Sequence, residues 1–159
     1  MTADLVPVQT EAPRFEDIVE TYLARDYIKA GKFAESLVHE AGAIQGFLLS
    51  LSGLCRSGNA RWAQQLAEIA SRRLRPNNPW SADLVELAVG RQKVDALLSE
   101  ELNGTAYCQI LFYGAVAAVN GGDKANARDL LRQAIDVDAP CLELHLAQRE
   151  SAHLESEDG

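Results

Sequence analysis

The stretch from Ala43 to Ser57, AIQGFLLSLSGLCRS, decides the fold class of this chain. Its large apolar residues recur three, four and seven positions apart, which places them on one face of an α-helix. These residues are Ile44, Phe47, Leu48, Leu51, Leu54 and Cys55. Because Gln45, Ser52 and Arg56 fall around another face, we predict an amphipathic helix over this stretch.

The same apolar spacing continues on both sides of this stretch, and strand-like runs are almost absent, so we predict an all-α fold. Glycine, asparagine and proline residues divide the chain into short segments. Asn78, Thr105 and Asp123 are expected to cap the amino ends of helices. We expect helices at 14–30, 32–41, 43–57, 60–75, 79–90, 92–102, 106–120, 124–137 and 140–154. They form four antiparallel pairs and one closing helix.

The chain of 159 residues has the size of one domain. We expect a flexible tail over 1–13, a helical domain over 14–154 and an acidic tail over 155–159, because neither end shows apolar periodicity. The net charge of −8 is concentrated at the ends: residues 1–30 carry −3, residues 31–119 carry zero and residues 120–159 carry −5.

Composition excludes several classes of protein. An acidic chain with a pI near 4.8 is disfavoured as a binder of duplex nucleic acid, which needs a basic surface. The longest nearly apolar run, Tyr107 to Val119, is thirteen residues, shorter than the roughly 20 that cross a bilayer, so no membrane span is predicted. The first residues do not resemble a signal peptide, and three cysteines do not suggest a disulfide framework. We therefore expect a cytoplasmic protein.

A repeat of small residues, glycine turns and prolines is visible in two places. The later copy reads Leu111, Gly114, Ala115, Ala118, Gly122, Asp123, Ala127, Leu131, Ala134 and Pro140. The earlier copy reads Phe47, Ser50, Leu51, Leu54, Gly58, Asn59, Ala63, Ala67, Ala70 and Pro76. This order resembles the tetratricopeptide repeat, a helix-turn-helix unit of about 34 residues with small residues where its two helices cross. The resemblance implies a short solenoid of stacked helix pairs with a capping helix at its carboxyl end.

The same resemblance implies a concave groove, lined by the first helix of each pair, that binds a peptide or a partner protein. Thr21 belongs to the expected lining of the first helix. The other expected groove residues are Arg25, Ile28, Lys29, Gln45, Leu48, Ser52, Arg56, Gln109, Phe112, Val116 and Asn120. Because this set places Leu48, Phe112 and Val116 beside the basic residues Arg25, Lys29 and Arg56, the groove suits an amphipathic segment with acidic residues.

No catalytic motif is found: the chain has no nucleophile elbow, phosphate-binding loop, zinc-protease helix or dinucleotide fingerprint. We predict no enzyme, no catalytic residue and no cofactor. Cys141, His145 and His153 form the best metal candidate, but a tetrahedral ion needs more ligands from a second element. The alternative is that Cys141 packs in the core and both histidines lie at a helix flank, so no metal site is predicted.

Five arginines lie within twenty residues, opposed only by Glu68: Arg56, Arg61, Arg72, Arg73 and Arg75. They are either a docking surface for an anionic ligand or a solvated helix face with favourable charge at a helix end. A third possibility is that the chain's own acidic ends neutralise them.

The segment from Tyr107 to Val119 is apolar all round, so another element must cover it. That cover is either the closing helix at 140–154 or a partner. We predict a protein-interaction module, an adaptor or chaperone that binds a peptide or partner protein. The alternative is a structural helical subunit of a larger complex or a homo-oligomer.

Overall fold

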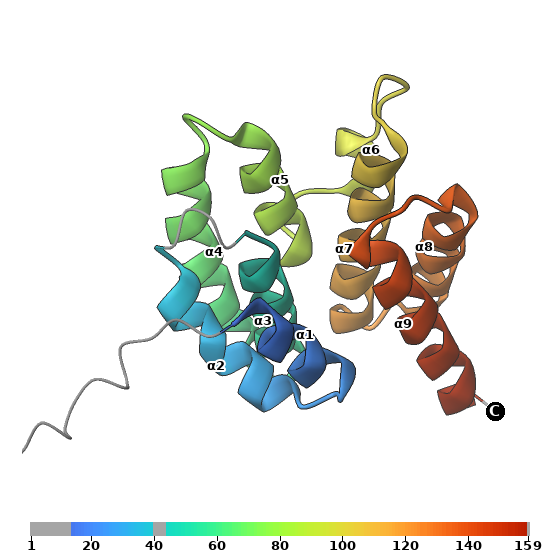
Figure 1. Ribbon diagram of the computed structural model, residues 1–159, viewed down its shortest axis with the longest axis horizontal. Helices are drawn as coiled ribbons and strands as arrows, with labels where there is room; N and C mark the ends of the chain where they lie inside the picture. The colour runs from blue at the N-terminus through green and yellow to red at the C-terminus, as the bar shows by residue number, and fades with distance from the viewer. Residues whose placement is uncertain (1–13, 40–43, 159) are drawn as a thin grey trace, which may run out of the picture.

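The computed structural model describes residues 14–39 and 44–158 (Figure 1). Within these ranges the chain forms helices and turns and contains no strand, so the all-α prediction is confirmed. The predicted tail at 1–13 lies outside the described residues. In chain order the helices are α1 (Phe15–Leu23), α2 (Tyr27–Leu37), α3 (Ile44–Arg56), α4 (Ala60–Leu74), α5 (Pro79–Ala88), α6 (Val94–Leu97), α7 (Gly104–Asn120), α8 (Lys124–Val137) and α9 (Leu142–Asp158).

The predicted helix at 14–30 is two helices in the structure, α1 and α2. They are separated by a turn at Arg25, whose φ of 66° lies in the left-handed region. The Arg25 N–H donates to the Tyr22 carbonyl at 3.0 Å, and the Asp26 N–H donates to the Thr21 carbonyl at 3.1 Å. This is the Schellman ending of a helix, which usually places glycine at the left-handed position. The sequence prediction missed the turn because an arginine occupies that position.

The expected boundary at Gly31 is also wrong, because Gly31 lies inside α2. There it lets α2 pack backbone against backbone on α3. A Cβ atom on Gly31 would lie 3.0 Å from the Leu54 backbone nitrogen, and one on Gly53 would lie 3.0 Å from the Tyr27 carbonyl oxygen. The two glycines are therefore a packing device, and the signal that had been interpreted as a helix end marks a helix crossing.

The connection between α5 and α7 differs from the prediction. Instead of a helix over 92–102, only the single turn α6 forms, and its Val94 side chain lies where a Cβ atom on Gly114 would be. α5 packs directly against α7, so the third predicted pair is not a hairpin. Asn103, and not Thr105, caps α7 by accepting a hydrogen bond from a backbone N–H of its first turn.

Helix α7 lies at the centre of the carboxyl-terminal half, packed against α5, α8 and α9 (Figure 1). α9 covers part of α7, as the closing-helix interpretation predicts, and α5 and α8 also cover buried residues of this helix. α9 continues to Asp158, so the tail predicted from 155 onwards is helical through that residue. Across the described ranges, no helix has both the length and the apolar content needed to cross a bilayer.

Candidate functional site

The carboxyl-terminal helix α9 is anchored by a buried carboxylate, that of Glu143, whose exposed fraction is 0%. Three neutral donors from two other helices point at it. The Gln45 amide of α3 lies at 3.0 Å, and the Tyr113 hydroxyl and Gln109 amide of α7 lie at 2.9 Å and 3.5 Å. Burial of a carboxylate costs free energy unless hydrogen bonds replace its water. We call the surface that these donors form with Arg56 the α9 groove.

A second buried carboxylate lies two turns further along α9. Glu150 accepts a hydrogen bond from Arg56 of α3 at 2.6 Å, and the two side chains are only 5% and 6% exposed. Arg56 also donates to the Tyr27 hydroxyl at 2.6 Å, and its guanidinium lies 4.9 Å from the centre of that ring. A buried ion pair is favourable only when its remaining groups are satisfied. Both terminal nitrogens of Arg56 have partners, but its Nε atom is buried without one in the described residues.

The charge state of this pair follows from its surroundings. Burial alone opposes a charge on Arg56, but the neighbouring Tyr22, Glu150 and Tyr27 outweigh burial and raise the pKa of Arg56 above its ordinary value. The guanidinium therefore stays protonated. Burial raises the pKa of Tyr27, so its hydroxyl stays neutral.

The apolar contacts of α9 come from residues between and beyond the two glutamates. Leu146, Ala147 and Leu154 are buried. The inward face of α9 therefore reads Glu143, Leu146, Glu150 and Leu154, with spacings of three, four and four residues. α9 is therefore an amphipathic helix that carries two acidic residues on its buried face.

The predicted groove residues fall into three groups in the structure. Gln45, Arg56 and Gln109 contact the glutamates of α9. Arg25 and Asn120 line an open cleft beside α9. These five are brought together around one helix.

The other predicted groove residues do not lie at this site. Leu48, Ser52, Phe112 and Val116 are 0% exposed, so they are buried inside the chain and do not lie on an open surface. Ile28 is 63% exposed and Lys29 is also exposed, both on α2. Their register was set by the wrong assumption that 14–30 is one helix.

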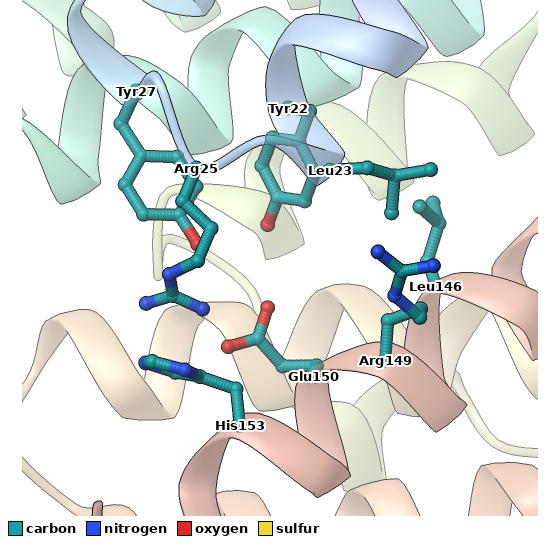
Figure 2. Close-up of a pocket in the computed structure, with 8 residues that line it drawn as sticks. All are labelled: Tyr22, Leu23, Arg25, Tyr27, Leu146, Arg149, Glu150 and His153. Carbon is teal, nitrogen blue, oxygen red and sulfur yellow. The ribbon is translucent and has the colours of Figure 1, made fainter.

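An open cleft lies between the α1–α2 turn and α9 (Figure 2). It consists of two adjoining pockets of about 160 and 330 Å³ that share Arg25, Tyr27, Glu150 and His153. The smaller pocket also includes Tyr22, Leu23, Leu146 and Arg149. Arg25 and Arg149 are both exposed, and the close-up shows their guanidinium groups on opposite sides of the space (Figure 2). The cleft is therefore basic, although the whole chain carries −8.

The Tyr22 side chain closes the smaller pocket from the α1 side. It is 3% exposed, and its hydroxyl points into the pocket (Figure 2). Within the described residues, that hydroxyl has no hydrogen-bond partner. Burial raises the pKa of Tyr22 well above its usual value, so the group is a neutral hydroxyl. An unsatisfied buried donor of this kind is uncommon in folded proteins.

The five-arginine cluster of the sequence is dispersed. Arg56 is buried against α9, whereas Arg72 pairs with Glu68 at 2.7 Å. Arg75 pairs with Asp83 at 3.1 Å and with Glu86 at 2.5 Å. Arg73 donates to the Val38 carbonyl at 2.9 Å. Arg72 and Arg75 are therefore neutralised within the amino-terminal half and Arg56 by Glu150 of α9, so the five arginines do not form one docking surface.

Two of the cysteines, Cys108 and Cys141, lie near the start of α9. Cys108 is buried, its thiol is 3.8 Å from the Ala134 carbonyl oxygen, and burial followed by the neighbouring Cys141 raises its pKa to about 12. Cys108 is therefore a protonated thiol at neutral pH. No group of three or more histidine, cysteine, aspartate or glutamate side chains in the described ranges is placed to hold a metal ion.

Sequence reasoning missed the residues of α9 that complete this site. Glu143 and Glu150 share one helix face with Leu146 and Leu154. Acidic residues on the otherwise apolar face of a helix are the signal that could have identified them. Tyr113 was concealed within the apolar run of α7, where it reads as an ordinary core residue.

Comparison of the chain with known protein families, with curated proteins and with solved structures gave no match in any of the three.

Proposed function

We propose that this chain is a protein-interaction module that binds an amphipathic acidic helix in the α9 groove. We further propose that α9 is the resident helix of that groove and that a partner helix displaces it. One observation carries the proposal: α9 is itself such a helix, seated with two buried glutamates on side chains of α3 and α7. In this scheme the helix pairs form a short tetratricopeptide-like stack, and α9 is its cap.

The contacts indicate which partner helices fit. A partner has to present a carboxylate to Gln45 and Tyr113, a second carboxylate to Arg56, and apolar residues between and beyond them. The matching pattern is Glu-x2-Leu-x3-Glu-x3-Leu, as in α9. A helix in a groove is recognised by anchors at such helical spacings. A partner helix displaces α9 when its binding free energy exceeds that of α9 in the same contacts.

The test uses a fluorescent peptide with the sequence of residues 140–158 and the full-length chain. In the chain, Leu154→Ala removes a buried contact of α9 and leaves every groove residue of α3 and α7 intact. We expect the peptide to bind this variant at least about tenfold more tightly than the wild-type chain, since about 1.4 kcal/mol corresponds to tenfold and removal of a buried leucine side chain costs about 2–5 kcal/mol. Fluorescence anisotropy measures the binding, and circular dichroism checks that the variant is folded.

Two controls make this test specific to the groove. Glu155→Gln in the chain changes an exposed residue of α9 and should leave peptide binding at the wild-type level. A peptide carrying Glu143→Gln and Glu150→Gln should bind the Leu154→Ala chain much more weakly than the unmodified peptide. Equal binding of the two peptides, or no binding to the folded variant, contradicts the proposal.

The homo-oligomer alternative takes a definite form in this structure. The apolar residues Phe112 and Val116 of α7 are buried, so they offer no surface to a second copy. A second copy does carry the same α9, so exchange of α9 between two chains produces a dimer with identical contacts. Light scattering on the Leu154→Ala chain with the added peptide distinguishes a peptide complex from such a dimer.

A further inference from the structure

We propose that the pocket between the α1–α2 turn and α9 is a binding site for a small oxyanion, a phosphate or carboxylate group held by Arg25, Arg149 and the Tyr22 hydroxyl. This site lies beside the α9 groove and is separate from it. The proposal does not depend on displacement of α9, because the pocket is open while α9 is in place (Figure 2).

The charges that line the pocket favour an anion. Glu150 also lines it, but its carboxylate is 2.6 Å from the Arg56 guanidinium and is neutralised by it. Neither Arg25 nor Arg149 has an ion pair within the part of the chain that the structure describes. Arginine guanidinium groups bind carboxylate and phosphate oxygens through parallel hydrogen bonds. The close-up shows the Arg25 and Arg149 guanidinium groups on opposite sides of the pocket, with the Glu150 carboxylate, which is paired with Arg56, between them (Figure 2). An oxyanion in this pocket would therefore bind beside a carboxylate that already has its own cation.

The Tyr22 hydroxyl is an independent observation that points to a ligand. It is buried, it has no hydrogen-bond partner in the described ranges and it points into this pocket. A buried hydroxyl without a partner is unfavourable unless something else accepts its hydrogen bond. An oxyanion bound between the two arginines supplies that acceptor. The same ligand then satisfies the hydroxyl and both cations.

The backbone at Arg25 supports the assignment. Three other helices of the described chain end with the same pair of backbone hydrogen bonds, and each places glycine at the left-handed position: Gly58, Gly90 and Gly122. Among these four endings, that of α1 alone uses a large charged residue in place of glycine, which is the unstrained choice. α8 also ends on a left-handed residue, Asp138 with a φ of 50°. Strained residues of this kind cluster at functional sites. Arg25 lines the pocket, and binding of an anion by its side chain would explain why an arginine, and not a glycine, occupies this strained backbone position.

The test measures thermal unfolding of the full-length chain with inorganic phosphate, with succinate and with sodium chloride at the same ionic strength. For a ligand at about 100 times its dissociation constant, linkage predicts a rise of roughly 5 to 10 °C in the unfolding midpoint. A rise with phosphate alone assigns a phosphate ligand, and a rise with succinate alone assigns a carboxylate. A rise with neither, relative to chloride, overturns the proposal.

The variants separate binding from folding. Arg25→Gly relaxes the backbone and should raise the unfolding midpoint without ligand, yet it should abolish the rise caused by the anion. Arg149→Gln should also abolish that rise, and Tyr22→Phe, which removes only the hydroxyl, should reduce it several-fold. Arg132→Gln is the matched control, because Arg132 is an exposed arginine paired with Asp129 that does not line the pocket. If the anion stabilises Arg25→Gly and Arg149→Gln as much as the wild type, the proposed site is wrong.

Discussion

Two helix junctions in this molecule are built by opposite means. α2 and α3 meet through Gly31 and Gly53, so that backbone touches backbone where the helices cross, and no ion pair joins them in the described residues. α9 meets α3 and α7 through Glu143 and Glu150, two buried carboxylates that need donors from the other helices. The first junction depends on shape and gives no other helix a place to bind. The second depends on hydrogen bonds and an ion pair between buried polar groups, and the proposed exchange of α9 rests on these polar contacts.

The largest expected effect tests the polar junction. Arg56→Met leaves the Glu150 carboxylate buried without its cation, and loss of one member of a buried pair costs about 3–5 kcal/mol in the free energy of unfolding. The double variant Arg56→Met with Glu150→Met removes both charges and should restore most of that loss. Urea unfolding followed by circular dichroism measures both effects.

The control for this prediction is an exposed ion pair. Arg72→Met removes the contact between Arg72 and Glu68, two side chains that are largely exposed to solvent. This change should lower the free energy of unfolding by at most about 0.5 kcal/mol. A similar small cost for Arg56→Met would show that water reaches Glu150 and that α9 is not held by this pair.

A smaller effect is expected at the glycine junction. Gly53→Ala places a Cβ atom 3.0 Å from the Ala30 Cβ and from the Tyr27 carbonyl oxygen, so α2 and α3 must separate. Overpacking of this kind costs about 1–3 kcal/mol. Gly104→Ala is the matched control, because its Cβ atom meets only Ala139 and Val137 at 3.5 and 3.6 Å, which is ordinary contact. Equal unfolding midpoints for the two variants would contradict the close crossing.

The smallest effect is a pH dependence near the start of α9. The pKa of Cys108 is raised from 9.0 to about 12, so the folded chain keeps the thiol protonated. Keeping this thiol protonated therefore stabilises the folded chain fully below pH 9. The contribution is lost as the pH rises from about 9 towards 12, because the thiol of the unfolded chain ionises first. Between about pH 8.5 and 10 we expect the free energy of unfolding to fall by about 1 kcal/mol. Urea unfolding at these pH values should show a shallower decline for Cys108→Ala; an unchanged decline would show that other groups cause it.

The all-α fold and most helix positions could be predicted from the sequence because apolar spacing and caps are local properties. Asn78 and Asp123, for example, cap α5 and α8 as expected. The turn at Arg25 could not be predicted, since the residue that adopts the left-handed backbone there lacks the usual signature. Gly31 gave a signal with two physical meanings, a helix end or a close crossing, and only the position of α3 distinguishes them.

The candidate site was only partly predictable for a related reason. Gln45, Arg56 and Gln109 were identified because the resemblance to the tetratricopeptide repeat places groove residues on the first helix of each pair. Glu143 and Glu150 were not, because their contacts lie 98 and 94 residues away along the chain. A local pattern can show that an acidic residue lies on the apolar face of a helix. It does not show which other helix donates the hydrogen bond to that residue.

The long separation between Arg56 and Glu150 also has a consequence for synthesis. Ribosomes add about 5–20 residues per second, so the 94 residues between these two side chains take about 5 to 20 s to make. Gly31 and Gly53 emerge much closer together, so α2 and α3 can pack early. During the remaining seconds, each nascent chain carries Arg56 and Gln45 without the carboxylates that α9 later brings. For that interval, the Arg56 guanidinium lacks the carboxylate that neutralises it in the folded chain.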